Sequence, residues 1–118
     1  NVFQNDGIRI ILVNNSNIKT PDYIEKISFT TFNELFKKLY KMGIYSIMVE
    51  AGQGLNSILF KNQEIDEINY FIAPKIFNRG VDFIKEDCEI GFKNVKIKKI
   101  DDDILINASV IKEKKWNF

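Results

Sequence analysis

The sequence contains no histidine in its 118 residues. That absence excludes serine–histidine and cysteine–histidine nucleophilic machinery, histidine-ligated zinc and a histidine pH switch. Any acid–base work falls to Asp, Glu, Lys or Tyr, and reactions in which a cofactor performs the difficult step become favoured. The single cysteine, Cys88, also excludes an internal disulfide framework and a metal site built from several cysteines.

A strong charge of one sign and long apolar runs are missing too. Seventeen basic and sixteen acidic residues give a net charge of +1, which argues against bulk attraction to nucleic acid or an anionic membrane. No run of about eighteen apolar residues is present to span a membrane, and the start does not resemble a signal peptide. The 45% hydrophobic and 28% charged content is typical of one soluble globular domain. We therefore expect a single cytoplasmic domain over residues 1–118, and the missing initiator Met suggests a piece of a longer protein.

The order of predicted elements is strand, strand, helix, strand, helix, strand and a final hairpin. The strands are expected at residues 8–13, 26–30, 45–50 and 68–73, the second helix near 55–59, and the hairpin over 95–111 with its turn at Asp101–Asp103. Strand–helix–strand units favour parallel pairing with right-handed crossovers, whereas a hairpin is antiparallel. The predicted fold class is α/β, a mixed, mainly parallel sheet flanked by helices with a C-terminal antiparallel hairpin.

The first helix has clear start and stop signals. Thr31-Phe32-Asn33-Glu34 has the T-x-x-E form of a capping box, and Gly43 is placed to end the helix in the left-handed conformation. The apolar residues recur at helical spacing and predict one buried face: Phe32, Leu35, Phe36, Leu39 and Tyr40.

The segment Val49-Glu50-Ala51-Gly52-Gln53-Gly54-Leu55 carries the most chemical information. It places a carboxylate at the end of a predicted buried strand and two glycines before a helix. The amides of Gly54, Leu55 and Asn56 are expected to lack partners inside that helix, and its dipole favours a phosphate there. Glycines in such a turn allow a positive φ or the close approach of a ligand. Two glycines between a strand and a helix are also ordinary turn chemistry, so the pattern alone leaves both interpretations open.

Two further blocks follow this segment, Ile65-Asp66-Glu67-Ile68 and Ile72-Ala73-Pro74-Lys75-Ile76. In their order and spacing, the three blocks resemble the C-terminal part of the reductase domain of RibD-type riboflavin-biosynthesis proteins, over about residues 8–112. That resemblance implies a dihydrofolate-reductase-like fold and an NADPH-dependent oxidoreductase. The implied reaction reduces 5-amino-6-(5-phosphoribosylamino)uracil to the ribitylamino product.

The resemblance also implies roles for single residues. Glu50 matches the glutamate that contacts the substrate and becomes the candidate catalytic residue, although a turn-stabilising or helix-capping carboxylate is the alternative. The segment expected to hold the NADPH phosphates comprises Gly52, Gln53, Gly54, Leu55, Asn56, Ser57 and Ile58. No metal ligand is expected. Lys75 either projects into solvent or reaches an anion near the site, and Asp66-Glu67 is expected to have a structural role.

The family's domain is nearly twice as long as this chain, so the sequence looks like the second half of a reductase domain. The first half and any preceding deaminase domain are then absent, and the chain alone is expected to be inactive. Two alternatives remain: another dihydrofolate-reductase-like reductase of a pyrimidine or pterin, or a non-catalytic fragment that self-associates. The expected partners are the small-molecule substrate and a second copy in a homodimer, with no nucleic acid and no membrane.

Overall fold

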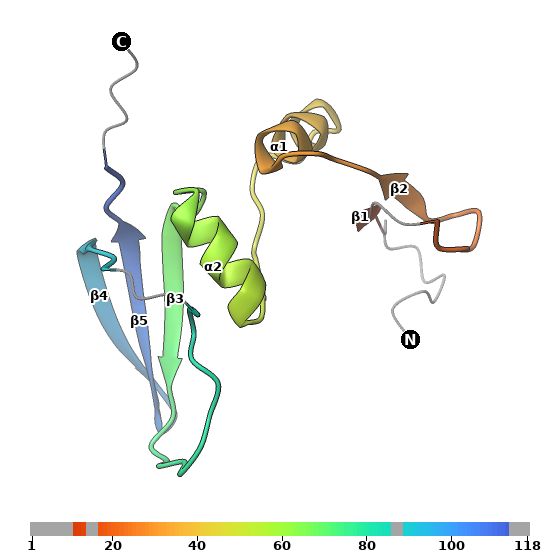
Figure 1. Cartoon of the computed structure of the whole chain (residues 1–118). Helices are drawn as coiled ribbons and strands as arrows, with labels where there is room; N and C mark the ends of the chain where they lie inside the picture. Colours follow the sequence, from red (N-terminus) through yellow and green to blue (C-terminus); the bar gives the residue numbers. More distant parts are fainter. Residues whose placement is uncertain (1–10, 14–16, 86–88, 114–118) are drawn as a thin grey trace. The chain divides into compact units, whose positions relative to one another are not determined.

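The computed structural model describes residues 11–13, 17–85 and 89–113 of the chain (Figure 1). Cys88 and the first residues of the strand predicted from position 8 lie outside these ranges. The chain divides into two compact units, Asn1–Met48 and Val49–Phe118. The single domain expected from the sequence stays a prediction.

The first unit contains two short strands and one helix. Strand β1 (Ile11–Val13) pairs in parallel with β2 (Glu25–Ile27), with Ile11 opposite Glu25 and Val13 opposite Ile27. Strand β2 begins one residue earlier than expected and is shorter. Helix α1 (Phe32–Lys41) follows.

The ends of α1 form as predicted. The Thr31 hydroxyl accepts a hydrogen bond from the Glu34 N–H at 3.2 Å, and the Glu34 carboxylate accepts one from the Thr30 N–H at 2.8 Å. At the other end Gly43 has a φ of 83°, its N–H donates to the Tyr40 carbonyl, and the Ile44 N–H donates to the Leu39 carbonyl. These two bonds form a Schellman motif, which satisfies carbonyl groups that the helix leaves free.

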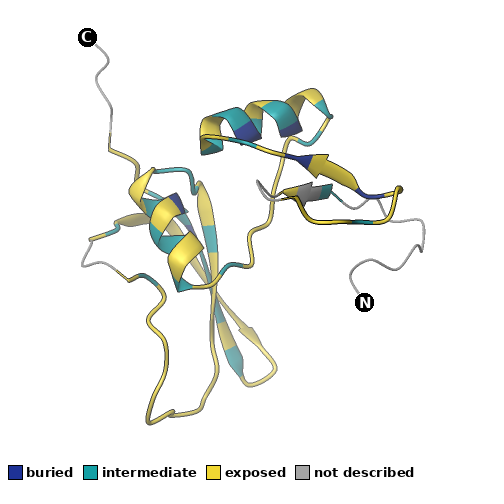
Figure 2. Cartoon of the chain, turned by 45° about the vertical axis from the view of Figure 1, so that its right-hand side comes forward, coloured by how far each residue is buried: buried dark blue, intermediate teal, exposed yellow. Residues whose placement is uncertain are grey.

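The core of this unit lies between α1 and β2. Ile27, Leu35 and Leu39 are buried, and Phe29, Phe32 and Phe36 pack around them with successive ring centroids 5.4 and 6.0 Å apart (Figure 2). The prediction that Tyr40 belongs to the buried face is wrong. Its side chain is 65% exposed and its ring contacts Tyr45 edge-on at 5.0 Å. The apolar stripe of α1 is therefore narrower than the spacing suggested.

The second unit contains helix α2 (Gln53–Lys61) and three strands, β3 (Glu67–Ile72), β4 (Phe92–Ile100) and β5 (Asp103–Val110). The strand order is β3-β5-β4, and both pairings are antiparallel. The predicted hairpin is confirmed, with Ile100 paired to Asp103. A mixed α/β fold is found, but the mainly parallel sheet is wrong, because the one parallel pairing in the described residues joins β1 and β2.

The strand predicted at Tyr45–Glu50 does not form, since residues 44–50 have no regular structure. A strand is defined by hydrogen bonds to a neighbour, and no pairing to this segment occurs in the described part of the chain. Its apolar side chains stay accessible, with Met48 80% and Ile47 47% exposed. The apolar pattern is compatible with a strand, but it does not provide a neighbouring strand for hydrogen bonding.

The two faces of the three-stranded sheet differ in chemistry. Ile68 lies opposite Ala108, and Tyr70 opposite Ile106, so these side chains share the apolar face. Ala108 is 1% exposed, and Leu59 of α2 is 3% exposed. Figures 1 and 2 show α2 lying along this sheet. The helix therefore covers the sheet on one side and is held there by burial of apolar surface.

The opposite face carries a polar ladder. The Asn107 amide donates to the Glu67 carboxylate at 2.6 Å and to the Asn69 side-chain oxygen at 3.0 Å. Asp66 forms an ion pair with Lys112. Both carboxylates of the Asp66-Glu67 pair thus take part in structural contacts, as expected.

Candidate functional site

Helix α2 begins at Gln53, and its N-cap is Gly52, whose φ of −80° and ψ of 175° are extended. The first helical hydrogen bond runs from the Asn56 N–H to the Gly52 carbonyl at 3.0 Å. The expectation that the Asn56 amide is available is therefore wrong. The N–H groups of Gln53, Gly54 and Leu55 precede that bond and have no acceptor inside the helix.

The surroundings of these amides suit an anion. The first turn of α2 has no acidic residue, so no carboxylate of the helix itself competes for the positive end of its dipole. A Cβ added at Gly52 or Gly54 would meet nothing within 4 Å among the described residues. Neither glycine has a positive φ, so backbone strain does not require glycine here. What the two glycines provide is open space beside the backbone.

Glu50 lies two residues before Gly52, in the same compact unit as α2, and its side chain is exposed. It lies at the end of a segment without regular structure, where a strand was predicted. The carboxylate is accessible to a ligand that reaches the start of α2.

The side chains of Asn56 and Ser57, in the next part of α2, form hydrogen bonds within the protein. The Asn56 amide donates to the Ala51 carbonyl at 3.3 Å and to the Phe83 carbonyl at 3.4 Å. The Ser57 hydroxyl donates to the Gln53 carbonyl at 2.7 Å and accepts from the Lys85 N–H at 2.8 Å. Both side chains therefore contact the chain's own backbone.

The loop at residues 83–85 was not singled out by the sequence, which reads there as irregular. The ring of Phe83 packs edge-on against Phe60 at 5.6 Å and against Tyr70 at 6.1 Å. The aromatic side chain of Phe83 suggests packing, but the sequence does not reveal which elements it contacts.

The remaining predicted residues lie apart from these contacts or on the surface. Leu55 and Ile58 are 41% and 47% exposed, which leaves apolar surface beside the start of α2. Lys75 is exposed, and its N–H donates to the Ala73 carbonyl at 2.8 Å. Within the described ranges, no group of three or more His, Cys, Asp or Glu side chains is arranged to hold a metal ion.

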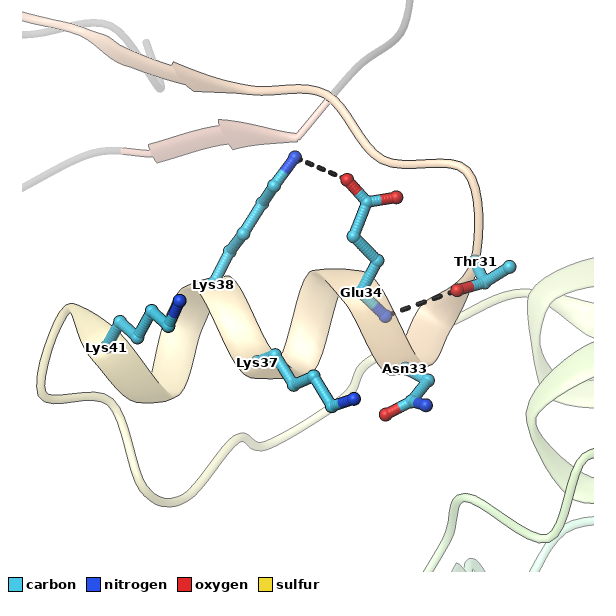
Figure 3. A pocket seen from close by; sticks show the side chains of 6 residues that line it. All are labelled: Thr31, Asn33, Glu34, Lys37, Lys38 and Lys41. Carbon is cyan, nitrogen blue, oxygen red and sulfur yellow. Dashed lines mark hydrogen bonds and ion pairs between the residues drawn. The ribbon is translucent and has the colours of Figure 1, made fainter.

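A shallow hollow lies along α1 in the first unit (Figure 3). The Lys38 ammonium contacts the Glu34 carboxylate at 2.7 Å and also donates to the Ser28 carbonyl at 2.7 Å. The Lys38 hydrogen bond, followed by that of the Thr30 N–H, lowers the pKa of Glu34 from its ordinary value of 4.5. Glu34 and Lys38 therefore contact each other and the backbone just before α1. The candidate site lies at the start of α2 instead.

Comparisons with known proteins agree with this fold. The model of the RibD C-terminal domain family matches residues 2–106. A diaminohydroxyphosphoribosylaminopyrimidine deaminase/5-amino-6-(5-phosphoribosylamino)uracil reductase from Thermotoga maritima superposes with a TM-score of 0.77 and 25% identity, over 91% of this chain and 32% of that one. The riboflavin biosynthesis reductase Rib7 of Saccharomyces cerevisiae superposes with a TM-score of 0.70 and 17% identity, over 86% of this chain and 55% of that one.

The fold is thus the mixed α/β fold of RibD reductase domains. The chain belongs to the RibD C-terminal domain family. A curated relative, the riboflavin biosynthesis protein RibD of Haemophilus influenzae, is 39% identical over 59 residues, which are 48% of this chain and 16% of that protein. The chain therefore spans a minor part of such relatives. Among the described residues, no helix is long and apolar enough to cross a membrane.

Proposed function

We propose that the chain forms part of an NADPH-dependent reductase of riboflavin biosynthesis. The proposed reaction reduces 5-amino-6-(5-phosphoribosylamino)uracil to the ribitylamino product. Family membership supports the reaction class. The observation that carries the assignment is the start of α2, where the Gln53, Gly54 and Leu55 amides have no helical acceptor and Glu50 lies just before them.

The residues present fit a dinucleotide phosphate. Three N–H donors at a helix start, with no acidic side chain in the first turn and open space at both glycines, can bind a diphosphate. We assign the segment Gly52–Ile58 to the cofactor on this basis, with the backbone of its first turn as the contact. When bound, the cofactor supplies the hydride that reduces the sugar carbon C1′.

Glu50 has the proposed substrate role. An exposed carboxylate beside the phosphate site can accept hydrogen bonds from a substrate held against the nicotinamide and orient its reacting carbon. Because the chain has no histidine, a carboxylate is among the few side chains that can act near neutral pH in this position.

Two substitutions test the assignment in a protein that contains the whole reductase domain. Glu50→Gln keeps the shape and removes the charge, so kcat should fall while the KM for NADPH changes little. Gly54→Val crowds the proposed diphosphate position, so the KM for NADPH should rise. Glu89→Gln and Gly80→Val are the matched controls, because Glu89 is exposed and a Cβ at Gly80 would likewise meet nothing within 4 Å. An unchanged kcat in Glu50→Gln, or an unchanged KM in Gly54→Val, refutes the corresponding role.

The substrate assignment has its own test. The same whole protein should oxidise NADPH when given 5-amino-6-(5-phosphoribosylamino)uracil. Absence of that oxidation would favour the alternative, another dihydrofolate-reductase-like reductase with a different pyrimidine or pterin substrate.

A further proposal concerns the chain by itself. Its candidate site consists of one carboxylate and one helix start, so we expect weak NADPH binding and no useful turnover. Micromolar affinity in a nicotinamide fluorescence titration would contradict this.

We also propose that the chain forms a homodimer, because β3 and β4 are the outer strands of the sheet and each offers an edge to a second copy. Light scattering that returns a mass near 13.8 kDa would exclude the dimer.

A further inference from the structure

We infer that Asn56 and Ser57 are positioning residues, whose side chains fasten the loop at residues 83–85 and the turn after Glu50 to the first half of α2. This inference deepens the proposed function, since it concerns the same segment. The two side chains then support the site, and the backbone of the first turn of α2 contacts the cofactor.

The Ser57 hydroxyl makes two hydrogen bonds to the protein's own backbone. It donates to the Gln53 carbonyl at 2.7 Å, four residues earlier in α2, and accepts the Lys85 N–H at 2.8 Å. A hydroxyl has one hydrogen to donate, and here that hydrogen is directed at a carbonyl oxygen. It has no second hydrogen for a phosphate. The Lys85 backbone is thereby fixed beside α2.

The Asn56 amide bridges two segments that are far apart in sequence. It donates to the carbonyl of Ala51, the residue next to Glu50, and to the carbonyl of Phe83, at 3.3 and 3.4 Å. The Phe83 ring adds edge-on contacts with Phe60 of α2 and Tyr70 of β3. One side chain thus links the Glu50 turn, the helix and the loop that follows β3.

Limited trypsin digestion of the 118-residue chain tests the Ser57 contact without any cofactor. Trypsin binds its substrate in an extended conformation, so cleavage after Lys85 requires the Lys85 N–H to leave Ser57. Cleavage after Arg79, in the exposed stretch before the anchored loop, gives an internal reference. When opening is fast, cleavage follows the population of the open form.

We expect Ser57→Ala to raise the rate of cleavage after Lys85 about fivefold relative to Arg79. That factor corresponds to about 1 kcal/mol, the usual net value of one hydrogen bond. Ser57→Thr retains the hydroxyl and should keep the original ratio, as should Ser46→Ala, an exposed serine of the other unit. An unchanged ratio in Ser57→Ala would overturn the inference.

Asn56 provides an independent pair of variants. Asn56→Ala removes the donor, whereas Asn56→Asp places a carboxylate against two carbonyl oxygens, so the ratio should rise more in the aspartate variant than in the alanine variant. Circular dichroism should show that each variant keeps its helices, as a control for folding. Equal, unchanged ratios in both would overturn the role of Asn56.

A cofactor titration of the whole reductase separates this inference from the proposed function. If the Ser57 hydroxyl contacted phosphate directly, Ser57→Ala would weaken NADPH binding at least tenfold without changing cleavage after Lys85, and the inference would be wrong. If NADPH does not bind at all, or Gly54→Val leaves its KM unchanged, the proposed function fails. The change in cleavage ratio would still show the anchoring role.

Discussion

The C-terminal end of α2 supports a quantitative prediction about stability. Gln63 follows the helix with a φ of 57°, its N–H donates to the Phe60 carbonyl at 3.0 Å, and the Glu64 N–H donates to the Leu59 carbonyl at 2.9 Å. This is the same Schellman motif that Gly43 forms at the end of α1, but with a residue that carries a Cβ. An L-residue pays roughly 1–2 kcal/mol in the left-handed conformation, whereas glycine does not.

Gln63→Gly should therefore stabilise the second unit. Relief of the left-handed strain is partly offset by the greater entropy of glycine in the unfolded chain, about 0.5–1 kcal/mol, which leaves a net gain of about 0.5–1 kcal/mol. Urea unfolding followed by circular dichroism should show a higher midpoint with an unchanged m-value. The thermal midpoint should rise by a few degrees.

Two matched substitutions separate strain relief from other effects. Gln63→Ala keeps the Cβ at the same φ and should give no gain. Gln53→Gly makes the same exchange at the first residue of α2, where φ is not positive, and should destabilise. The reasoning would be refuted if Gln63→Gly were no more stable than the original chain, or if Gln63→Ala stabilised equally.

Three further outcomes are expected from local contacts. Thr31→Ala should lower the free energy of unfolding by about 1 kcal/mol, measured in urea, because it removes the side-chain cap on the Glu34 N–H. The pKa of Glu34 is lower in the folded state than its ordinary value of 4.5. The contribution of the Glu34 carboxylate to stability is therefore complete above pH 4.5 and is lost as the pH falls through the folded-state pKa. The difference in unfolding free energy between the original chain and Glu34→Gln should shrink over that pH range. Asn107→Asp should destabilise by about 1 kcal/mol, measured in urea, because a carboxylate would face the oxygens of Glu67 and Asn69 across the strands. Asn78→Asp, at an exposed asparagine outside the helices and strands, is the control.

Features that depend on neighbours in sequence were predictable. The T-x-x-E pattern and Gly43 specify the two ends of α1 through contacts within five residues, and the structure contains those contacts. The hairpin likewise follows from alternation around a short turn. The acidic residue and the two glycines of the candidate site were also visible, because they lie within five positions of one another.

Features that depend on distant partners were not predictable. The segment 45–50 has the pattern of a buried strand, yet a pattern specifies which side chains favour burial and not which backbone pairs with them. The loop at residues 83–85 was missed for the same reason, since Asn56 and Ser57 meet it 27 and 28 positions away. The set of available amides shifted by one residue because Gly52 is the N-cap and α2 begins at Gln53, one residue earlier than the expected amides required.

The segment from Gly52 to Ile58 combines both kinds of information. Its motif indicates a phosphate site, and at the level of the motif all seven residues have the same role. The hydrogen bonds distinguish the backbone of this segment from its side chains. The amides of the first turn have no acceptor inside the helix, whereas the side chains of Asn56 and Ser57 bond to the chain's own backbone. A helix start can bind an anion with its backbone alone, because those N–H groups are free whatever the side chains are. The side chains just beyond the first turn are then available to hold the surrounding loops. A substitution of these side chains should therefore loosen the loops more than it weakens anion binding.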